Sequence, residues 1–289
     1  MRNRVNGWGS AGAMTPAIVM LLFVAMPHVA AAQAPNTAAG AARPAPRTPN
    51  IPRLPDGKPN FNGIWQSNNT ANWDILDHHA SMGPVVAMGA IGAIPGGLGV
   101  VEGNELPYLP AALEKKKKNQ ADWLNLDPEV KCFMPGIPRA VYQPFPFQIV
   151  QTPTHMLMAY EFASASRSIN MSTKMQRPPV GAWMGFSLGH WEGDTLVVNV
   201  TDQMEDTWFD RAGNHHSDEV VVVERYTMTS PDAIRYEATI TDPKTFSRPW
   251  KMSMPLYRRL EKNAQLVEFK CVEFVEELMY GEFRKKTTN

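Results

Sequence analysis

This chain of 289 residues has only two cysteines, and neither sign of charge is in excess. Lysine and arginine together number 28, as do aspartate and glutamate, so the chain offers no cationic field for nucleic acid or anionic lipid. It also lacks C-x-x-C, H-x-H and H-x-x-x-H spacings, which argues against thiol redox chemistry, attached haem and zinc-finger sites. We therefore expect no cofactor and no nucleic-acid partner.

The first 32 residues have the layout of a secretory signal. Arg2 and Arg4 precede an apolar core over residues 17–26, and small residues lead to a cleavage site after Ala32, with Ala34 as the alternative. The apolar core is shorter than the roughly 20 residues that span a bilayer. The sequence thus predicts a periplasmic or secreted protein without a transmembrane span after cleavage. A retained N-terminal anchor is the alternative.

The two cysteines, Cys132 and Cys271, are expected to form a disulfide, because lone thiols in an oxidising compartment most simply pair. Two buried free thiols are the alternative. Residues 33–57 consist mostly of Ala, Pro, Arg, Thr and Asn and have little to bury. We expect them to form a disordered tether between the signal and the folded domain.

The sequence of residues 58–143 predicts an N-terminal strand, a loop and a short helix that pack on a β domain. The strand is expected over Phe61–Gln66, and the helix over Leu109–Trp123, whose four lysines at 115–118 fit a solvated face. The segment Met82–Val101 has 20 residues without charge. Its Gly and Pro content favours an apolar loop or lid over a membrane helix.

Residues 144–289 predict the β core. Short runs with alternating or β-branched residues are joined by turn signals such as WEGD and SPDA, which indicates an antiparallel meander closing into a lipocalin-like barrel or a strongly curved sheet. On the run at 219–229, Val220, Val222 and Tyr226 should share one face and Arg225 the other. Nine strands are expected, over 147–153, 155–162, 166–171, 182–191, 194–202, 219–229, 233–242, 250–259 and 265–274.

Several motifs resemble a broad family of exported, functionally uncharacterised proteins of Gram-negative bacteria. They are PFQIVQTP, CFMPGIPR, AWMGFSLGHWEGDTLVVNV, TWFDRAGNHHSDEVVVVERY, ITDPKTFSRPW and VEFKC, and they cover about residues 106–273. Asp210, Gly213, His216 and Ser217 fall on a recurring D-x-x-G-x-x-H-S element of that family. Arg167 matches a recurring arginine. A weaker likeness is the G-x-W at residues 63–65, which lipocalins carry on their first strand. The resemblance implies export and a shared fold, and no established activity.

The polar segment around residues 206–219 is the predicted site. An Asp210 carboxylate that holds the His216 ring would make an imidazole suited to general acid–base work. A purely structural Asp–His hydrogen bond is the alternative. Arg167, Tyr160, Trp183 and Trp208 are predicted to bind the substrate.

A metal site and a serine triad are two other chemistries to consider for the same region. A metal site would need His216 with Asp218, or His215 with Glu219, to converge from one face of a strand. We expect no serine triad, because Ser217 directly follows His216 and neighbours on a strand diverge.

The sequence therefore predicts an exported β-barrel that accommodates a small apolar or aromatic molecule, leaning toward a cofactor-independent lyase, hydratase or isomerase. The alternative is a non-catalytic periplasmic ligand-binding or envelope-associated protein, and the weaker alternative is a metal-dependent hydrolase. The expected partner is a small molecule, and the oligomeric state stays open.

Overall fold

The computed structural model describes residues 50–172 and 177–283, all of them in one compact unit, Thr48–Asn289. The expected signal and most of the expected tether lie outside the described residues.

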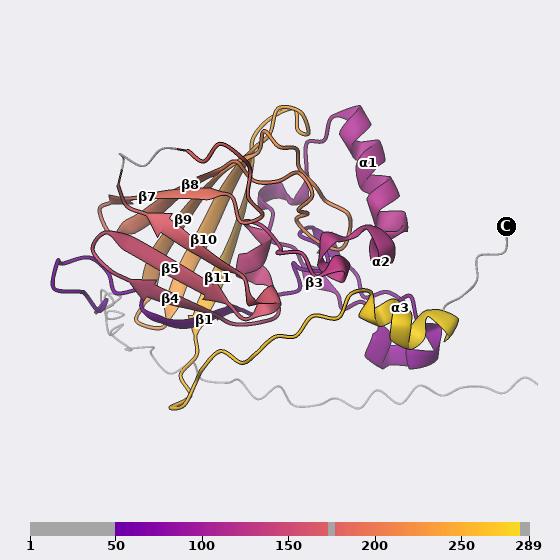
Figure 1. Cartoon of the computed structure of the whole chain (residues 1–289), viewed down its shortest axis with the longest axis horizontal. Coiled ribbons are helices and arrows are strands. Elements are labelled where there is room, and N and C mark those ends of the chain that lie inside the picture. Colours follow the sequence, from indigo (N-terminus) through magenta and orange to yellow (C-terminus); the bar gives the residue numbers. More distant parts are fainter. Residues whose placement is uncertain (1–49, 173–176, 284–289) are drawn as a thin grey trace, which may run out of the picture. The chain divides into compact units, whose positions relative to one another are not determined.

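The core of this unit is a closed β-barrel, as predicted, seen at the left in Figure 1. Neighbouring strands follow the order β1-β11-β10-β9-β8-β7-β6-β5-β4, and β1 closes the barrel by pairing with both β11 and β4. The strands are β1 (Gly63–Ser67), β4 (Phe147–Gln151), β5 (His155–Tyr160), β6 (Ser166–Asn170), β7 (Phe186–Glu192), β8 (Thr195–Thr201), β9 (Val221–Ser230), β10 (Ala233–Thr241) and β11 (Trp250–Arg258).

Two details differ from the predicted meander. Strands β6 and β7 are parallel, whereas every other neighbouring pair is antiparallel. A parallel pair needs a crossover of about a dozen residues, and the connection between residues 171 and 185 has that length. The strand expected over 265–274 is not formed, because β1 occupies the edges of both β4 and β11 and leaves no edge for it.

The barrel interior is filled by inward-pointing side chains, which alternate with outer ones on most strands, although β8 has three consecutive buried residues at 196–198. On β9, Val222 and Tyr226 are buried while Arg225 is half-buried on the outer face, as the pattern predicted. The sequence predicts a barrel that accommodates a small molecule. The aromatic and methionine side chains inside it, including Trp65, Met156, Met158 and Tyr160, instead form a continuous hydrophobic core with residues of the other strands.

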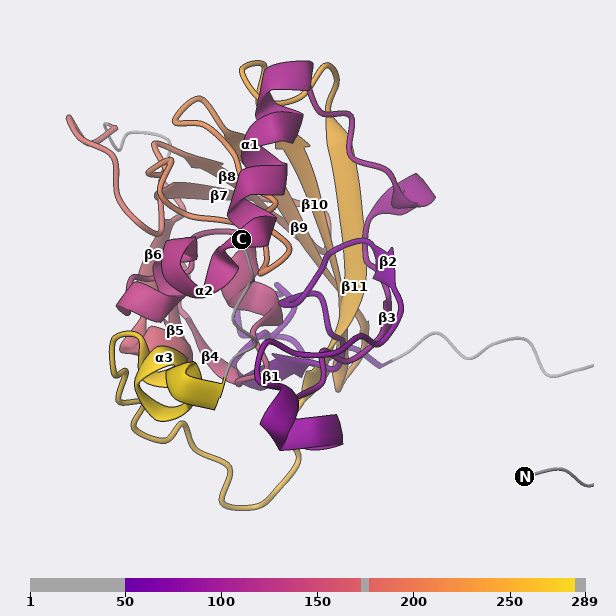
Figure 2. The same ribbon diagram turned by 90° about the vertical axis from the view of Figure 1, so that its right-hand side faces the viewer.

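Short helices and loops lie beyond one end of the barrel, at the right in Figure 1 and in front of the strands in Figure 2. The α-helices are α1 (Pro110–Ala121), α2 (Trp123–Leu126) and α3 (Val275–Tyr280), and β2 (Asp77–His78) pairs with β3 (Gly97–Leu98). Single-turn or irregular 3-10 segments span Val86–Gly92, Glu102–Asn104, Pro128–Lys131, Arg139–Tyr142, Phe162–Ser164 and Gly281–Phe283.

The uncharged segment Met82–Val101 does not form one helix. It contains the 3-10 segment Val86–Gly92, interrupted by Gly89 at φ 56°, and then β3. Within the described part of the chain, no helix combines the length and hydropathy that crossing a bilayer would need.

The predicted disulfide between Cys132 and Cys271 is present, with 5.6 Å between the Cα atoms. It ties residues 259–283, which follow β11, to the loop after α2. We call residues 259–283 the C-terminal strap.

Candidate functional site

Asp210, one of the two predicted catalytic residues, is fully buried and serves as a hydrogen-bond acceptor for the backbone. Its Oδ2 accepts from the Ile75 amide at 2.9 Å and from Asn214 Nδ2 at 2.6 Å, and its Oδ1 accepts from the Asn214 amide at 3.1 Å. The carboxylate thereby fixes its own turn and the segment before β2.

His216 is also buried, and its ring nitrogens have other partners. Nδ1 lies 2.8 Å from the Ser217 carbonyl, and Nε2 lies 2.7 Å from Thr207 Oγ1 and 3.0 Å from Gln203 Nε2. A ring protonated on Nδ1 donates to the carbonyl and accepts at Nε2. Burial lowers the pKa of His216, which favours this neutral ring.

The expected Asp210–His216 pair is therefore not formed: among the described residues, no hydrogen bond joins the two side chains. Each side chain is enclosed by partners that leave it no access to a ligand. The geometry supports the structural alternative, in which both residues hold the turn in place.

Arg167 and Tyr160, two of the predicted binding residues, point into the barrel. Arg167 Nη1 lies 2.8 Å from Glu224 Oε2, and the hydroxyls of Tyr226 and Tyr236 donate to Glu224 Oε1 at 2.8 and 2.9 Å. Burial raises the pKa of Tyr160 to about 12, so its hydroxyl stays neutral. This network pairs the buried charges within the core rather than presenting them to a ligand, although Arg167 Nε has no hydrogen-bond partner among the described residues.

Trp183 and Trp208 lie apart from that network. The Trp183 ring stacks on Phe133 with 4.5 Å between centroids, and Trp208 is buried in a β-bridge with His215. The four predicted binding residues are thus distributed over two regions.

The segment GFSLG has the G-x-S-x-G spacing of a nucleophile elbow, at Gly185, Ser187 and Gly189. That elbow places its serine on an exposed strand-to-helix turn. Ser187 instead lies within strand β7, and its buried Oγ has no hydrogen-bond partner. Among residues 50–172 and 177–283, no base is hydrogen-bonded to this serine to activate it.

The strongest candidate site lies outside the barrel and centres on Arg211, which the sequence analysis did not single out. Its guanidinium carbon lies 4.7 Å from the Trp73 ring centroid and 5.1 Å from that of Trp123. The two indoles meet edge to face, with 5.8 Å between centroids. Cation–π contacts of this kind hold the arginine in place while leaving it partly exposed.

Three adjoining depressions share Arg211, and together we call them the Arg211 cleft. One, of about 170 Å³, is apolar and also lined by Trp73, Trp123 and Met88. A second, of about 230 Å³, adds the polar side chains of Asp74 and His78. The third, of about 170 Å³, runs beneath the C-terminal strap.

Acidic groups behind the cleft are strongly perturbed. Burial, and then the Asp74 carboxylate, raise the pKa of Asp210 to about 7. Burial likewise raises the pKa of Glu129 to about 7, against the opposing effect of Arg139, which lies 2.9 Å away. Asp210 is enclosed and sets the charge behind the cleft, whereas Glu129 lines the depression beneath the strap.

A larger depression, of about 570 Å³, lies between β11 and the loops at 68–71 and 96–100, and its lining has no charged side chain. Within residues 50–172 and 177–283, no group of three or more His, Cys, Asp or Glu is placed to hold a metal ion. In the hypothetical metal set, His216 is buried while Asp218 and Glu219 bind Lys244 at the surface.

No protein-family model, curated protein or solved structure matches this chain. The grouping with exported proteins of Gram-negative bacteria therefore stays a prediction.

One signal in the sequence could have identified one of the two missed residues. Glu224 has the same parity as Val222 and Tyr226 on its strand, so alternation alone places it in the barrel interior. Arg211 lies inside the D-x-x-G-x-x-H-S element, but its contacts with Trp73 and Trp123 join segments far apart in the chain. No local pattern reveals those contacts.

Proposed function

We propose that this chain is a non-catalytic binding protein for a small, largely apolar molecule, held in the Arg211 cleft rather than inside the barrel. The observation that carries the proposal is the pair of indoles, Trp73 and Trp123, that walls the apolar depression. Small-molecule sites are concave and lined mostly by apolar and aromatic side chains, with few polar groups that fix orientation. The cleft has this composition.

The position of the buried acid–base residues supports binding over turnover. A general base must lie within hydrogen-bond reach of the proton it abstracts. Asp210 and His216 are enclosed by other partners, so neither side chain can reach a proton of a bound ligand. They are also not hydrogen-bonded to each other. The disulfide supports an extracytoplasmic location, since such bonds persist in oxidising compartments.

The barrel serves as the scaffold in this proposal. It fixes β9 and the turn that precedes it, and this turn presents Arg211 to the cleft. Export and an envelope setting then fit a carrier or sensor of an apolar compound.

Fluorescence titration with N-phenyl-1-naphthylamine, a neutral aromatic probe, tests the proposal. Trp123→Ala should weaken binding about tenfold, which corresponds to about 1.4 kcal/mol. Trp191→Ala is the matched control, because this indole stacks on Phe61, away from the cleft. Absence of saturable binding, or equal binding by wild type and Trp123→Ala, would overturn the proposal.

A further inference from the structure

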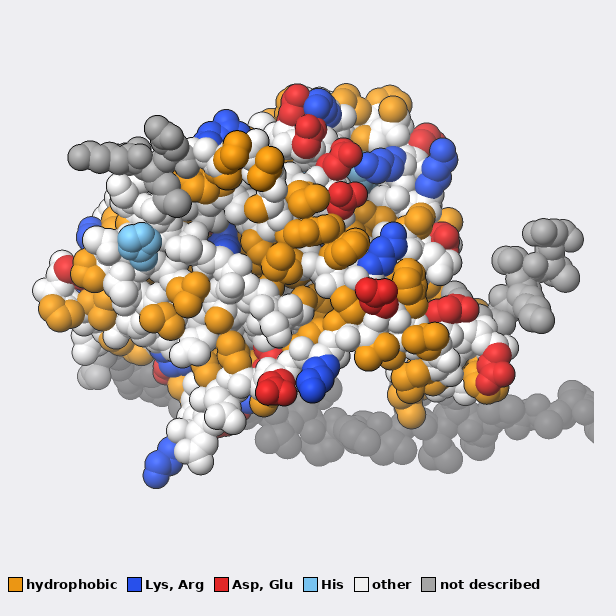
Figure 3. Space-filling model, in the orientation of Figure 1, with side chains coloured by type: hydrophobic (Ala, Val, Ile, Leu, Met, Phe, Trp, Pro, Cys, Tyr) orange, Lys and Arg blue, Asp and Glu red, His pale blue; other side chains and the backbone are white. Residues whose placement is uncertain are grey.

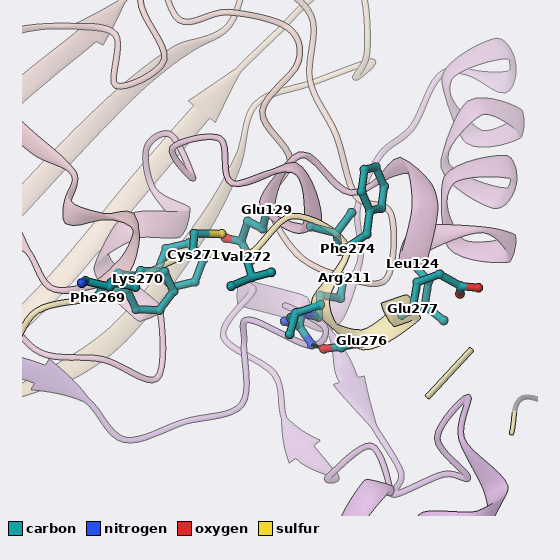
Figure 4. A pocket seen from close by; sticks show the side chains of 13 residues that line it. Leu124, Glu129, Arg211, Phe269, Lys270, Cys271, Val272, Phe274, Glu276 and Glu277 are labelled. Carbon is teal, nitrogen blue, oxygen red and sulfur yellow. Dashed lines mark hydrogen bonds and ion pairs between the residues drawn. The ribbon is translucent and has the colours of Figure 1, made fainter. Parts of the chain in front are cut away.

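The C-terminal strap places a carboxylate of its own in the Arg211 cleft. Glu276, in the first turn of α3, approaches Arg211 with 3.4 Å between Oε1 and Nη1. Figure 4 shows the two side chains lying toward one another beside Leu124 and Glu277. The strap thus shows which chemistry this position accepts: an acidic group next to an apolar surface.

This contact is weak enough to be replaced. The Arg211 and Glu276 side chains are 21% and 36% exposed, and ion pairs of this kind contribute about 0–1 kcal/mol. Helix α3 also has no buried residue, and its Leu278 and Met279 face solvent. Figure 3 shows apolar and acidic side chains gathered around this helix at the lower right.

The disulfide keeps the weak contact populated. Cys271 is bonded to Cys132, and the Phe269 ring lies 5.3 Å from Phe145 and 4.9 Å from Phe162, so the strap is anchored just before α3. A short tether holds its end at a local concentration in about the millimolar range. Glu276 therefore returns to Arg211 whenever that position is vacant.

We propose that the Arg211 cleft takes an apolar ligand bearing an anionic group, a carboxylate or a sulfonate, and that Glu276 competes with this group for Arg211. The inference rests on the proposed function and adds the charge of the ligand and its internal competitor. The apolar body would lie against Trp73 and Trp123 in the apolar depression that they line, and the anion would take the place of the Glu276 carboxylate.

The charges around the cleft are compatible with an anion at this point. Glu129 shares Arg139 with Asp127, and burial raises the pKa of Glu129 to about 7, which reduces its negative charge near neutral pH. Asp74 lies in the neighbouring depression, and burial raises its pKa as well. Exchanging one carboxylate for another at Arg211 leaves the net charge of the cleft unchanged.

Two probes that differ in one sulfonate test the inference. 8-Anilinonaphthalene-1-sulfonate carries the anion, and N-phenyl-1-naphthylamine is its neutral counterpart. Arg211→Met should weaken binding of the sulfonate probe by about tenfold or more, because a charge-assisted hydrogen bond contributes about 1.5–3 kcal/mol. Binding of the neutral probe should change by less than about twofold. Arg235→Met, on an exposed face of β10, is the matched control.

The competing carboxylate is tested separately. Glu276→Gln should strengthen binding of the sulfonate probe by up to about fivefold, the equivalent of about 1 kcal/mol, and leave the neutral probe unchanged. Glu282→Gln, also on the strap, should have no effect. This variant alters an exposed group, so the test stands even where Arg211→Met fails to fold.

The outcomes separate the two proposals. The inference would be overturned if wild type and Arg211→Met bind the sulfonate probe equally, or if Glu276→Gln shows no gain in affinity for it. The proposed function would still stand in that case, provided that binding of the neutral probe is weakened by Trp123→Ala. Loss of the Trp123 dependence overturns the proposed function itself.

Discussion

The ion pair between Arg167 and Glu224 offers a direct test of whether the barrel interior is dry. Both side chains are almost fully buried, with 2% and 0% exposed. Glu224→Gln would leave the Arg167 guanidinium in the core without a carboxylate. Removing one partner of a buried pair costs about 3–5 kcal/mol, because an uncompensated charge stays behind.

Arg167→Met should cost a similar amount, since the Glu224 carboxylate would keep only the donors Tyr226 and Tyr236. The double variant removes both charges, so it should cost clearly less than the sum of the two single changes. Urea unfolding followed by circular dichroism, with fluorescence as a second probe of two-state behaviour, gives the three free energies of unfolding.

A cost below about 1 kcal/mol for Glu224→Gln would contradict this account. It would mean that water or a ligand reaches the guanidinium, and the predicted binding role of Arg167 would regain support. In folded Arg167→Met protein, we expect unchanged affinity for N-phenyl-1-naphthylamine.

Three further predictions concern the turn before β9. The pKa of Asp210 is raised from 3.8 to about 7 by burial and then by Asp74, so the folded chain holds this proton more tightly than the unfolded chain. The stabilisation that the Asp210 proton contributes should therefore be full below about pH 4 and be lost as pH rises through about 7. Asp210→Asn should remove this pH-dependent contribution, at most about 4 kcal/mol, in urea midpoints measured from pH 4 to 8. His216→Gln should cost about 1–3 kcal/mol in thermal melts and leave probe binding intact, whereas lost binding in a stable variant would restore a functional role. Gly213→Ala should destabilise the protein by about 2 kcal/mol or more, because φ is 85° and a Cβ would lie 2.6 Å from the backbone of α1. Gly103→Ala has a similar φ and open space around it, so a smaller loss of melting temperature is expected there.

The strands were predictable because their signal is local. Alternation along β9 and β10 reports which face is buried, and turn residues between runs mark the hairpins. The N-terminal strand was also expected from its sequence, and it is the element that closes the barrel. The disulfide followed from the count of cysteines, since only one pairing is possible.

The ninth expected strand, over residues 265–274, shows that a local sequence pattern alone does not determine whether a strand forms. Residues 265–274 have the composition of a strand, with Val267, Phe269 and Cys271 in alternation with Glu268 and Lys270. A strand also needs a free edge, and whether one exists depends on how the barrel closes. The same limit applies to the site, because the Arg211 cleft joins residues from the loop before β2, from α2, from the turn before β9 and from the strap.

The turn at residues 210–217 shows how structural residues can position a residue of the candidate site. Asp210 accepts a hydrogen bond from the Ile75 amide, and Ser217 donates to Asp242 through its amide at 2.6 Å and its hydroxyl at 2.7 Å. Each of these residues fixes the turn against another part of the molecule. Arg211 is the residue of this turn that lines the cleft. The proposed binding role of Arg211 therefore depends on side chains that contact no ligand themselves, which is why a pattern of polar residues in the sequence does not separate the two kinds of residue.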